Sequence, residues 1–289
     1  MNITPIHEEF GVRISGVDLA QTLDEKTFAQ IGDAINRYSL VLFENQQMND
    51  STHLAFTRRF GELEEEHVSY YSLGKVTYIG RVGNIDDDGN KVSPRQIKAS
   101  TGNEMWHSDS SFREIPAMYS ILAAYEVPAE AGETEFASAR AAYQRLDQQT
   151  RELIDSKIGI HDYIYSRTKV GEDAVTQNQR TYMHPVRQRL VRQNPVTGEK
   201  NIFVGSHVKQ IEGMPDAEAR SLIERLIDEV TRAESVYRHR WQAGDVMIWD
   251  NRCILHRGCG YDADRYRRRM HQARVRGRGP SIAEVLDND

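Results

Sequence analysis

Two short segments, far apart in the chain, carry side chains that can bind a metal ion. The first holds His107 and Asp109 in a His-x-Asp arrangement, and the second holds His256 shortly after an apolar, strand-like run. Residues i and i+2 of a β-strand point to the same face, so His107 and Asp109 can project together. Two imidazoles and one carboxylate bind one face of a non-haem Fe(II) and leave the other positions open. The pattern therefore predicts that His107, Asp109 and His256 hold iron in an oxygenase.

A basic stretch downstream of His256 offers a partner for an acidic cosubstrate. An open Fe(II) site often takes a 2-oxoacid, and Arg suits its distal carboxylate because the planar guanidinium binds a carboxylate through two N–H groups. In a strand, Arg268 shares a face with Gln272 and Arg274. A solvated basic strand and a nucleic-acid patch are the alternatives, and the formal net charge of −6 argues against nucleic acid.

Further motifs accompany these residues in a characteristic order. They are Trp106–Phe112 (WHSDSSF), Gly132–Phe136 (GETEF), Tyr237–Trp241 (YRHRW) and Gly244–Gly258. On these motifs the chain resembles the TauD/TfdA family of Fe(II)/2-oxoglutarate-dependent dioxygenases, and within it the 2,4-dichlorophenoxyacetate (aryloxyalkanoate) dioxygenases. The resemblance covers nearly the whole chain. It implies that His107, Asp109 and His256 are the iron ligands.

The resemblance also implies which residues bind 2-oxoglutarate. Thr134 matches a threonine that contacts the cosubstrate, and Arg268 matches the arginine that pairs with its distal carboxylate. Asn103 matches an asparagine near the cosubstrate. Many relatives carry a second arginine four residues after the first, and here that position is Gln272. Arg274, on the same predicted strand face, could supply the missing charge.

The resemblance implies a reaction that consumes 2-oxoglutarate and O2 and gives succinate and CO2, with ascorbate supporting activity. The carbon next to the ether oxygen of an aryloxyalkanoate is hydroxylated, and the hemiacetal collapses to a phenol and a 2-oxoacid. The same chemistry on a sulfonate, an alkylsulfate or another small carboxylate is the main alternative. A zinc hydrolase stays open, since two histidines and a carboxylate also bind Zn²⁺. A non-catalytic jelly-roll binding module stays open too.

A small anionic substrate needs a cationic or donor side chain near the metal. The candidate substrate-binding residues are His67, Lys75, Arg81, His207 and Phe112. Each also has an ordinary explanation, as a surface residue or, for Phe112, as part of the core. The sequence does not choose between these roles.

Composition is that of an ordinary globular enzyme. No stretch approaches the roughly 18 apolar residues of a membrane helix, and the N-terminus shows no signal-peptide pattern. The chain has two cysteines, Cys253 and Cys259, which makes a disulfide framework improbable and indicates a reducing compartment. We expect a cytoplasmic homo-oligomer that binds neither membrane nor nucleic acid.

Short strands with intervening helices predict one domain over residues 1–289, mainly β with flanking helices. The resemblance implies a double-stranded β-helix (jelly roll) core. Residues 62–105 are predicted to be irregular and residues 163–185 to be a polar insertion, and both are expected to form active-site loops or insertions. Asp24 is the expected cap of a first helix, and Asp50 or Ser51 that of a second.

Overall fold

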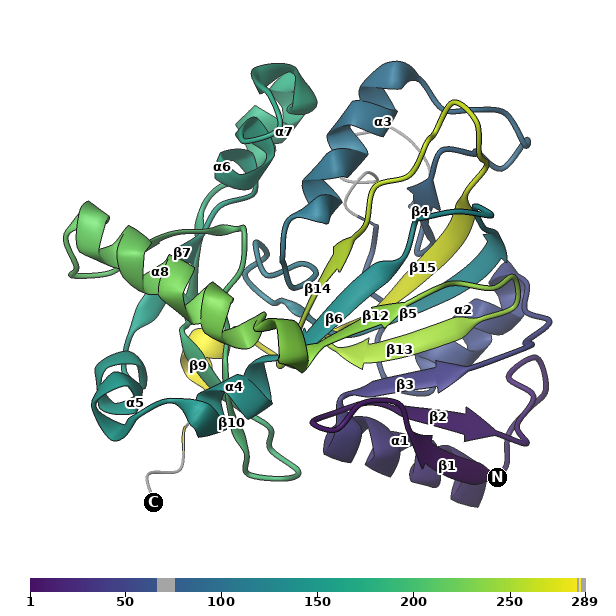
Figure 1. Cartoon of the computed structure of the whole chain (residues 1–289), viewed down its shortest axis with the longest axis horizontal. Helices are drawn as coiled ribbons and strands as arrows, with labels where there is room; N and C mark the ends of the chain where they lie inside the picture. The colour runs from purple at the N-terminus through teal and green to yellow at the C-terminus, as the bar shows by residue number, and fades with distance from the viewer. Residues whose placement is uncertain (67–75, 285, 287–289) are drawn as a thin grey trace.

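The computed structural model, which describes residues 1–66, 76–284 and 286, is built around a seven-stranded sheet (Figure 1). The strand order is β1-β2-β3-β13-β5-β15-β4, and all neighbours are antiparallel except β2 and β3. The strands are β1 (Asn2–Pro5), β2 (Val12–Ser15), β3 (Leu40–Phe43), β13 (Val246–Asp250), β5 (Ala117–Glu126), β15 (Arg269–Arg276) and β4 (Gly80–Gly83). Strands from both ends of the sequence therefore share one sheet.

A three-stranded antiparallel sheet packs against one face of this large sheet. Its order is β12 (Val236–His239), β6 (Thr134–Ser138) and β14 (Ile254–Gly258). Leu122, Trp249 and Met270 of the large sheet pack with Phe136 of the smaller sheet in one buried cluster. The rings of Phe136 and Trp249 lie 5.5 Å apart. Central strands of this kind are apolar on both faces because both are covered. The two sheets form the expected jelly-roll core.

Two helices, α1 (Glu25–Tyr38) and α2 (Asp50–Arg58), cover the other face of the large sheet (Figure 1). Asp24 caps α1, as predicted, by accepting a hydrogen bond from the Thr27 amide. The predicted cap of α2 is wrong. Asn49 fills that position and forms a reciprocal capping box with Thr52, so Asp50 is the first helical residue.

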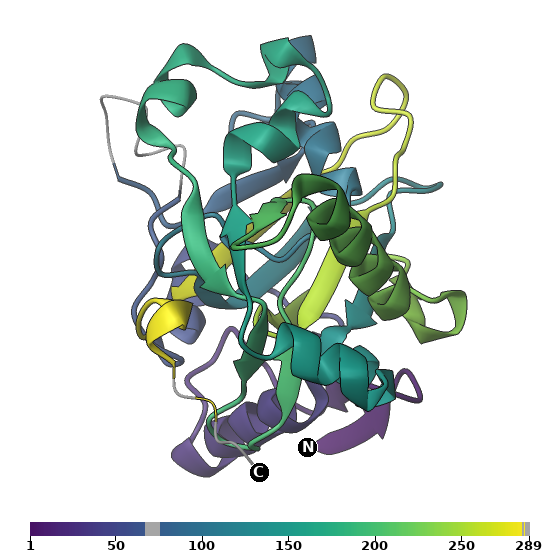
Figure 2. The same cartoon turned by 90° about the vertical axis from the view of Figure 1, so that its left-hand side faces the viewer.

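A second body of structure lies beside the sheets and is seen face-on in Figure 2. Its elements are α4 (Ala139–Arg145), α5 (Gln148–Ile154), β7 (Ile158–His161), β8 (Val186–Arg189), β9 (Val191–Gln193), β10 (Lys200–Ile202), β11 (Val208–Ile211) and α8 (Asp216–Val230). Leu255 of β14 belongs to its apolar cluster. This body is therefore packed directly against a strand of the smaller sheet.

The two segments predicted to be active-site loops or insertions contain short helices where the structure describes them. Residues 62–105 contain β4, α3 (Pro94–Ser100) and the 3₁₀ helix η2 (Thr101–Glu104), and residues 163–185 contain α6 (Tyr163–Thr168) and α7 (Gln177–Tyr182). A capping box at Ser93 starts α3. Lys98 of α3 and Asp173 form an ion pair at 2.7 Å, which joins the two segments at one end of the molecule (Figure 1).

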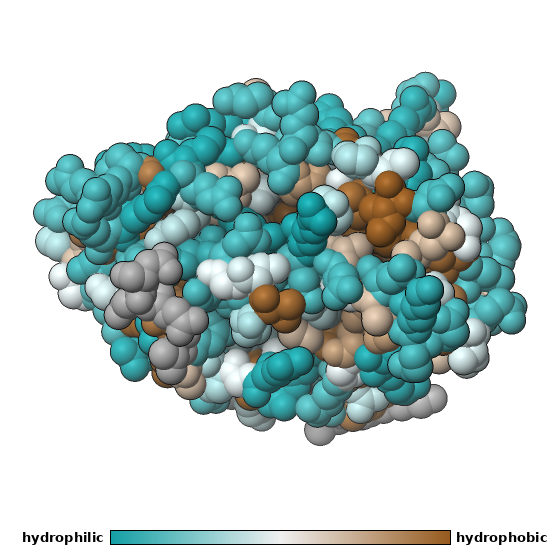
Figure 3. All heavy atoms as spheres, turned by 90° about the horizontal axis from the view of Figure 1, so that it is seen from below, coloured by the Kyte–Doolittle hydropathy of each residue, from teal (hydrophilic) through white to brown (hydrophobic). Residues whose placement is uncertain are grey.

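The face shown in Figure 3 is mainly hydrophilic and carries separate, small hydrophobic patches. Across the described residues the exposed large apolar side chains are Met1, Ile3, Val76, Leu153, Tyr182, Val196 and Ile282. None of the helices in the described ranges combines the length and apolar character needed to cross a membrane.

Candidate metal centre

Two backbone hydrogen bonds join the segments that carry the predicted metal ligands. The His107 amide donates to the His256 carbonyl at 3.0 Å, and the His256 amide donates to the His107 carbonyl at 2.9 Å. His256 lies in the middle of β14, so its predicted position at or beyond a strand end is wrong. His107 forms only this isolated bridge, and Asp109 already lies in a turn. The predicted strand for this pair is therefore wrong, although the two side chains do converge.

The three predicted ligands meet in one cluster. The Asp109 Oδ1 atom lies 3.8 Å from His107 Nε2 and 3.7 Å from His256 Nε2. One donor atom from each residue lies within 4.8 Å of the other two. His107 Nδ1 lies 2.7 Å from the Met105 carbonyl, which assigns the ring proton to Nδ1 and leaves the Nε2 lone pair free for a metal.

Asp109 is held so that one carboxylate oxygen faces the histidines. Its Oδ2 atom accepts hydrogen bonds from Ser120 Oγ at 2.6 Å and Gln272 Nε2 at 2.8 Å. Asn251 accepts a weak hydrogen bond from the Asp109 amide at 3.3 Å and donates to Ser120 Oγ at 2.8 Å. With Oδ2 saturated in this way, Oδ1 is the oxygen available to a metal.

The electrostatic environment favours the protonation states that metal binding needs. Burial lowers the pKa of His256 to about 3 and also lowers the pKa of His107, so both imidazoles are neutral at physiological pH. Burial raises the pKa of Asp109, but its interactions with His256, Arg274 and His107 and the hydrogen bond from Ser120 outweigh burial and leave that pKa below the ordinary value. A neutral pair of imidazoles and an ionised carboxylate fit a divalent cation.

A cavity of about 100 Å³ opens beside these ligands. Its lining includes three residues predicted to bind 2-oxoglutarate, namely Asn103, Thr134 and Arg268, together with Gln272. Thr134 Oγ1 accepts a hydrogen bond from Trp241 Nε1 at 2.8 Å, and Asn103 Oδ1 accepts one from Arg167 at 2.8 Å. The fold thus brings the predicted metal and cosubstrate residues to one site.

Arg268 is the cation of this cavity. Its side chain is buried and makes no ion pair or side-chain hydrogen bond with any residue that the structure describes. Burial lowers its pKa to about 10, which still leaves it charged at neutral pH. Asn84 fixes its backbone by exchanging two hydrogen bonds with it. Gly83 must be glycine, since its φ is 132° and a Cβ there would lie 2.0 Å from the Arg268 carbonyl oxygen.

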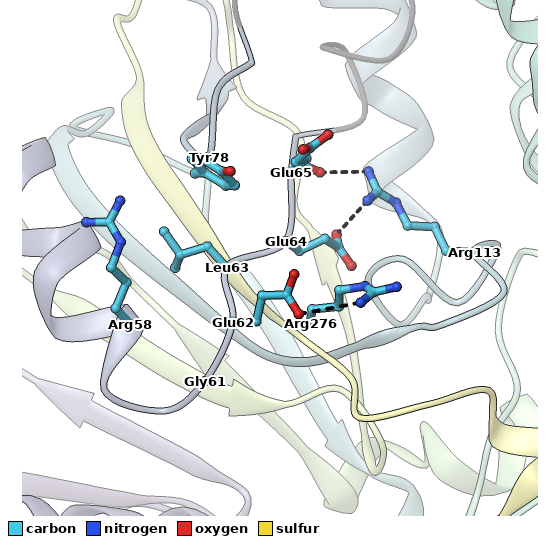
Figure 4. Close-up of a pocket in the computed structure, with 9 residues that line it drawn as sticks. All are labelled: Arg58, Gly61, Glu62, Leu63, Glu64, Glu65, Tyr78, Arg113 and Arg276. Atoms are coloured by element: carbon cyan, nitrogen blue, oxygen red, sulfur yellow. Dashed lines mark hydrogen bonds and ion pairs between the residues drawn. The ribbon is translucent and has the colours of Figure 1, made fainter.

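Arg274 lies behind the cavity and is surrounded by acids. Its guanidinium donates to Glu64 at 2.8 Å, to Glu66 at 2.5 Å and to Gln272 Oε1 at 2.7 Å. The last contact fixes the orientation of the Gln272 amide, whose Nε2 then faces Asp109. Glu64 also lines a separate cavity of about 680 Å³ on the far side of this network (Figure 4).

The predicted substrate-binding residues have different positions. His207 is buried, its ring lies 6.2 Å from that of His107, and Phe112 lies 4.9 Å from His207. Arg81 is not part of the cavity lining and pairs with Asp50 at 3.3 Å and with Asp87. His67 and Lys75 lie outside the described residues.

Sequence reasoning missed the side chains that orient Asp109. Ser120 reads as an ordinary residue of a buried strand, and no local pattern marks it. The sequence marks Gln272 as a position without the second arginine, and it does not indicate that the side chain contacts Asp109, as the structure shows. The i, i+2 spacing of Gln272 and Arg274 on one strand is the signal that could have suggested their contact.

Comparisons with known proteins agree with this geometry. Residues 2–274 match the sequence profile of the family described as "Taurine catabolism dioxygenase TauD, TfdA family". The chain is 36% identical over 264 residues to an alpha-ketoglutarate-dependent 2,4-dichlorophenoxyacetate dioxygenase of Cupriavidus pinatubonensis, covering 89% of this chain and 92% of the relative. It is 34% identical over 300 residues to an (S)-phenoxypropionate/alpha-ketoglutarate-dioxygenase of Delftia acidovorans, covering 99% and 98%.

A solved structure is similar over almost the whole chain. The crystal structure of AAD-2 in complex with Mn(II) and N-oxalylglycine superimposes with a TM-score of 0.89 at 34% identity. The likeness covers 98% of this chain and 99% of that one. The sequence and structure comparisons thus both find proteins that match almost the whole chain.

The contact between Gln272 and Asp109 predicts an effect on metal affinity. Gln272→Leu removes one of the two donors to Oδ2, and we expect the Kd for Mn(II), measured by electron paramagnetic resonance or calorimetry, to rise roughly tenfold or more. Arg276→Met, four residues further along at the exposed end of β15, is the matched control and should bind Mn(II) like the unchanged protein. His256→Ala should bind no Mn(II). A Gln272→Leu variant with unchanged affinity would show that the contact is dispensable.

Proposed function

The chain belongs to the TauD/TfdA family of dioxygenases, and we propose that it is an Fe(II)- and 2-oxoglutarate-dependent dioxygenase that oxidises aryloxyalkanoates. The observation that carries the proposal is the cavity in which a His-Asp-His cluster lies together with Arg268, which has no acidic partner in the described ranges. A metal ligand set with open positions and a buried cation without a counter-ion suit a cosubstrate that chelates a metal and carries a second carboxylate.

His107, Asp109 and His256 would hold the iron. Their neutral imidazoles and single available carboxylate oxygen provide the donors that Fe(II) accepts. When bound, the iron supplies the activation of O2 that 2-oxoglutarate drives by losing CO2 to become succinate. The protein's own contribution is to fix the ligand atoms, to keep the ligand carboxylate ionised and to exclude water from the cavity.

Arg268 would bind the distal carboxylate of 2-oxoglutarate, with Thr134 and Asn103 as further contacts in the same cavity. N-oxalylglycine has the skeleton of 2-oxoglutarate with an N–H in place of one methylene, so the ligand of the similar AAD-2 structure supports this assignment. Because Arg274 donates to Glu64, Glu66 and Gln272, we assign it to positioning Gln272 rather than to binding the cosubstrate.

The substrate class rests on the relatives and on the aromatic side chains beside His107. An aryl ether acid, 2-oxoglutarate and O2 would give the hydroxylated acid, succinate and CO2. The resulting hemiacetal releases a phenol, and the side chain leaves as a 2-oxoacid such as glyoxylate. Phe112 and His207 would flank the aryl group near His107. Because the family description names taurine, a sulfonate or alkylsulfate is the second candidate.

We also propose that residues 1–289 form one domain and that the protein is a cytoplasmic homo-oligomer. Strands from both ends of the chain in one sheet support the single domain. The free thiols of Cys253 and Cys259 support a reducing compartment. Analytical ultracentrifugation tests the assembly, and a single boundary at 33.1 kDa would rule out a stable oligomer.

The proposed reaction predicts coupled products. With Fe(II), ascorbate, 2-oxoglutarate and O2, we expect phenoxyacetate or 2-phenoxypropionate to give equal amounts of succinate and phenol. Taurine and an alkylsulfate serve as the comparison. Succinate formed only with the sulfur acids would retain the chemistry and exclude the aryloxy assignment, and no succinate with any acid would exclude the dioxygenase.

The role of Arg268 predicts a selective change in cosubstrate affinity. Arg268→Met removes charge-assisted hydrogen bonds worth about 1.5–3 kcal/mol, so the KM for 2-oxoglutarate should rise roughly 10- to 150-fold. Arg267→Met is the matched control, because the neighbouring Arg267 is half-exposed and pairs with Glu126 at 2.7 Å. Equal effects of the two substitutions would contradict the assignment.

A further inference from the structure

Arg167 is a second buried cation near the metal centre. It lies on α6, and only 9% of it is exposed. Its Nη2 donates to Asn103 Oδ1 at 2.8 Å, whereas Nε and Nη1 are buried and have no hydrogen-bond partner among the described residues. No carboxylate in the described ranges pairs with it. Burying a guanidinium without a counter-charge is costly, so the arrangement suits a group that gains its anion when a ligand binds.

Arg167 is connected to the cavity in two ways. Asn103, which it contacts directly, is part of the cavity lining together with His107. The guanidinium also occupies the space beside Gly102, where a Cβ would lie 1.9 Å from Nη1. Its charge is close enough to contribute to lowering the pKa of His107 and of His207, in both cases after the larger effect of burial.

An aromatic surface runs from Arg167 to the metal ligand His107. The Arg167 guanidinium carbon lies 5.2 Å from the centre of the Tyr163 ring, and Tyr163 packs on Phe112 at 4.8 Å. Phe112 lies 4.9 Å from His207, whose ring is 6.2 Å from that of His107. A cation at one end and a row of rings leading to the metal suit a ligand with a carboxylate and an aryl group.

The buried arginines around the site differ in their partners. Arg274 is neutralised by Glu64 and Glu66. Arg268 and Arg167 have no acidic partner in the part of the chain that the structure describes. The proposed reaction brings two acidic small molecules into the site. Two unpaired cations therefore correspond to two anionic ligands.

We propose that Arg167 binds the carboxylate of the substrate while Arg268 binds that of 2-oxoglutarate, an inference that rests on the proposed function. Because Asn103 is the cavity residue in contact with Arg167, the carboxylate would replace Asn103 Oδ1 as the acceptor at Nη2. Exchanging a neutral acceptor for a charged one strengthens the hydrogen bond. Arg167 thereby becomes a specificity residue for acidic substrates.

The test compares a carboxylate with its neutral counterpart in the complete site. Phenoxyacetate and phenoxyacetamide are titrated by calorimetry into the protein loaded with Mn(II) and N-oxalylglycine. We expect Arg167→Met to weaken phenoxyacetate binding about tenfold or more and to change phenoxyacetamide binding less than threefold. Affinity for N-oxalylglycine should also change less than threefold, because Arg268 is intact. In turnover, the KM for phenoxyacetate should rise more than kcat falls.

Two further variants keep the test decisive. Arg180→Met, on α7 of the same insertion, removes an arginine that pairs with Glu172 and should leave both titrations unchanged. Arg167→Gln can still donate to Asn103 Oδ1, and it replaces Arg167→Met in the comparison if circular dichroism shows that the methionine variant does not fold. Unchanged phenoxyacetate binding, or equal loss of the acid and the amide, would overturn the proposal.

Failure of the proposed function has a different signature. If the unchanged protein neither binds nor converts phenoxyacetate, the aryloxy assignment fails and the role of Arg167 fails with it. If the unchanged protein converts phenoxyacetate and the Arg167 variants do so with the same KM, only the role of Arg167 is overturned.

Discussion

The pair of backbone hydrogen bonds between His107 and His256 is the constraint on which the site depends. His107 belongs to an irregular segment that no ladder of strand pairing holds, whereas His256 lies within β14. The bridge fixes the two imidazoles at a centroid distance of 4.2 Å. Since β14 pairs with β6, and Thr134 lies opposite Gly258, the same strand also places a cavity residue. One local pairing therefore fixes the positions of the proposed metal ligands and of a proposed cosubstrate residue together.

Neighbouring charges and hydrogen bonds keep the partly buried carboxylate of Asp109 ionised. Hydrogen bonds run from the partly buried Asp109 through Gln272 and Arg274 to Glu64 and Glu66, and the last four residues are buried. An amide alone can turn either way, and Arg274 removes that freedom because it can only donate. The neutral Gln272 thus does what an arginine in its place would not: it supports the ligand carboxylate without adding an unpaired charge to the cavity.

The sequence predicted that His107, Asp109 and His256 would cluster and that the core would be rich in sheet, because possible metal ligands are recognisable by residue type and buried strands by apolar runs. It predicted the His107–Asp109 pair for a wrong reason, since the two converge across a bridge and a turn, where Ser110 adopts a φ of 54°, and not along a strand. Helices α3, α6 and α7 were missed because they have only six or seven residues, too few for a helical period to emerge. Arg167 was missed with them, since only tertiary packing against Gly102 shows that it is buried.

The buried arginines Arg268 and Arg167 give more information about the ligands than the His-Asp-His cluster does. Two neutral imidazoles and one carboxylate leave a divalent metal with one net positive charge and open positions, so the cluster suits a chelating anion but does not locate the carboxylates that lie away from the metal. Arg268 and Arg167 are buried without an acidic partner among the residues that the structure describes. A fold selected for stability alone would avoid this by pairing them, as it pairs Arg274, or by replacing them with apolar side chains. The free-energy cost of burying these two guanidinium groups is offset only when anions bind beside them. The two arginines therefore indicate that two anionic ligands bind. The rings of Tyr163 and Phe112 indicate that one of these ligands carries an aryl group.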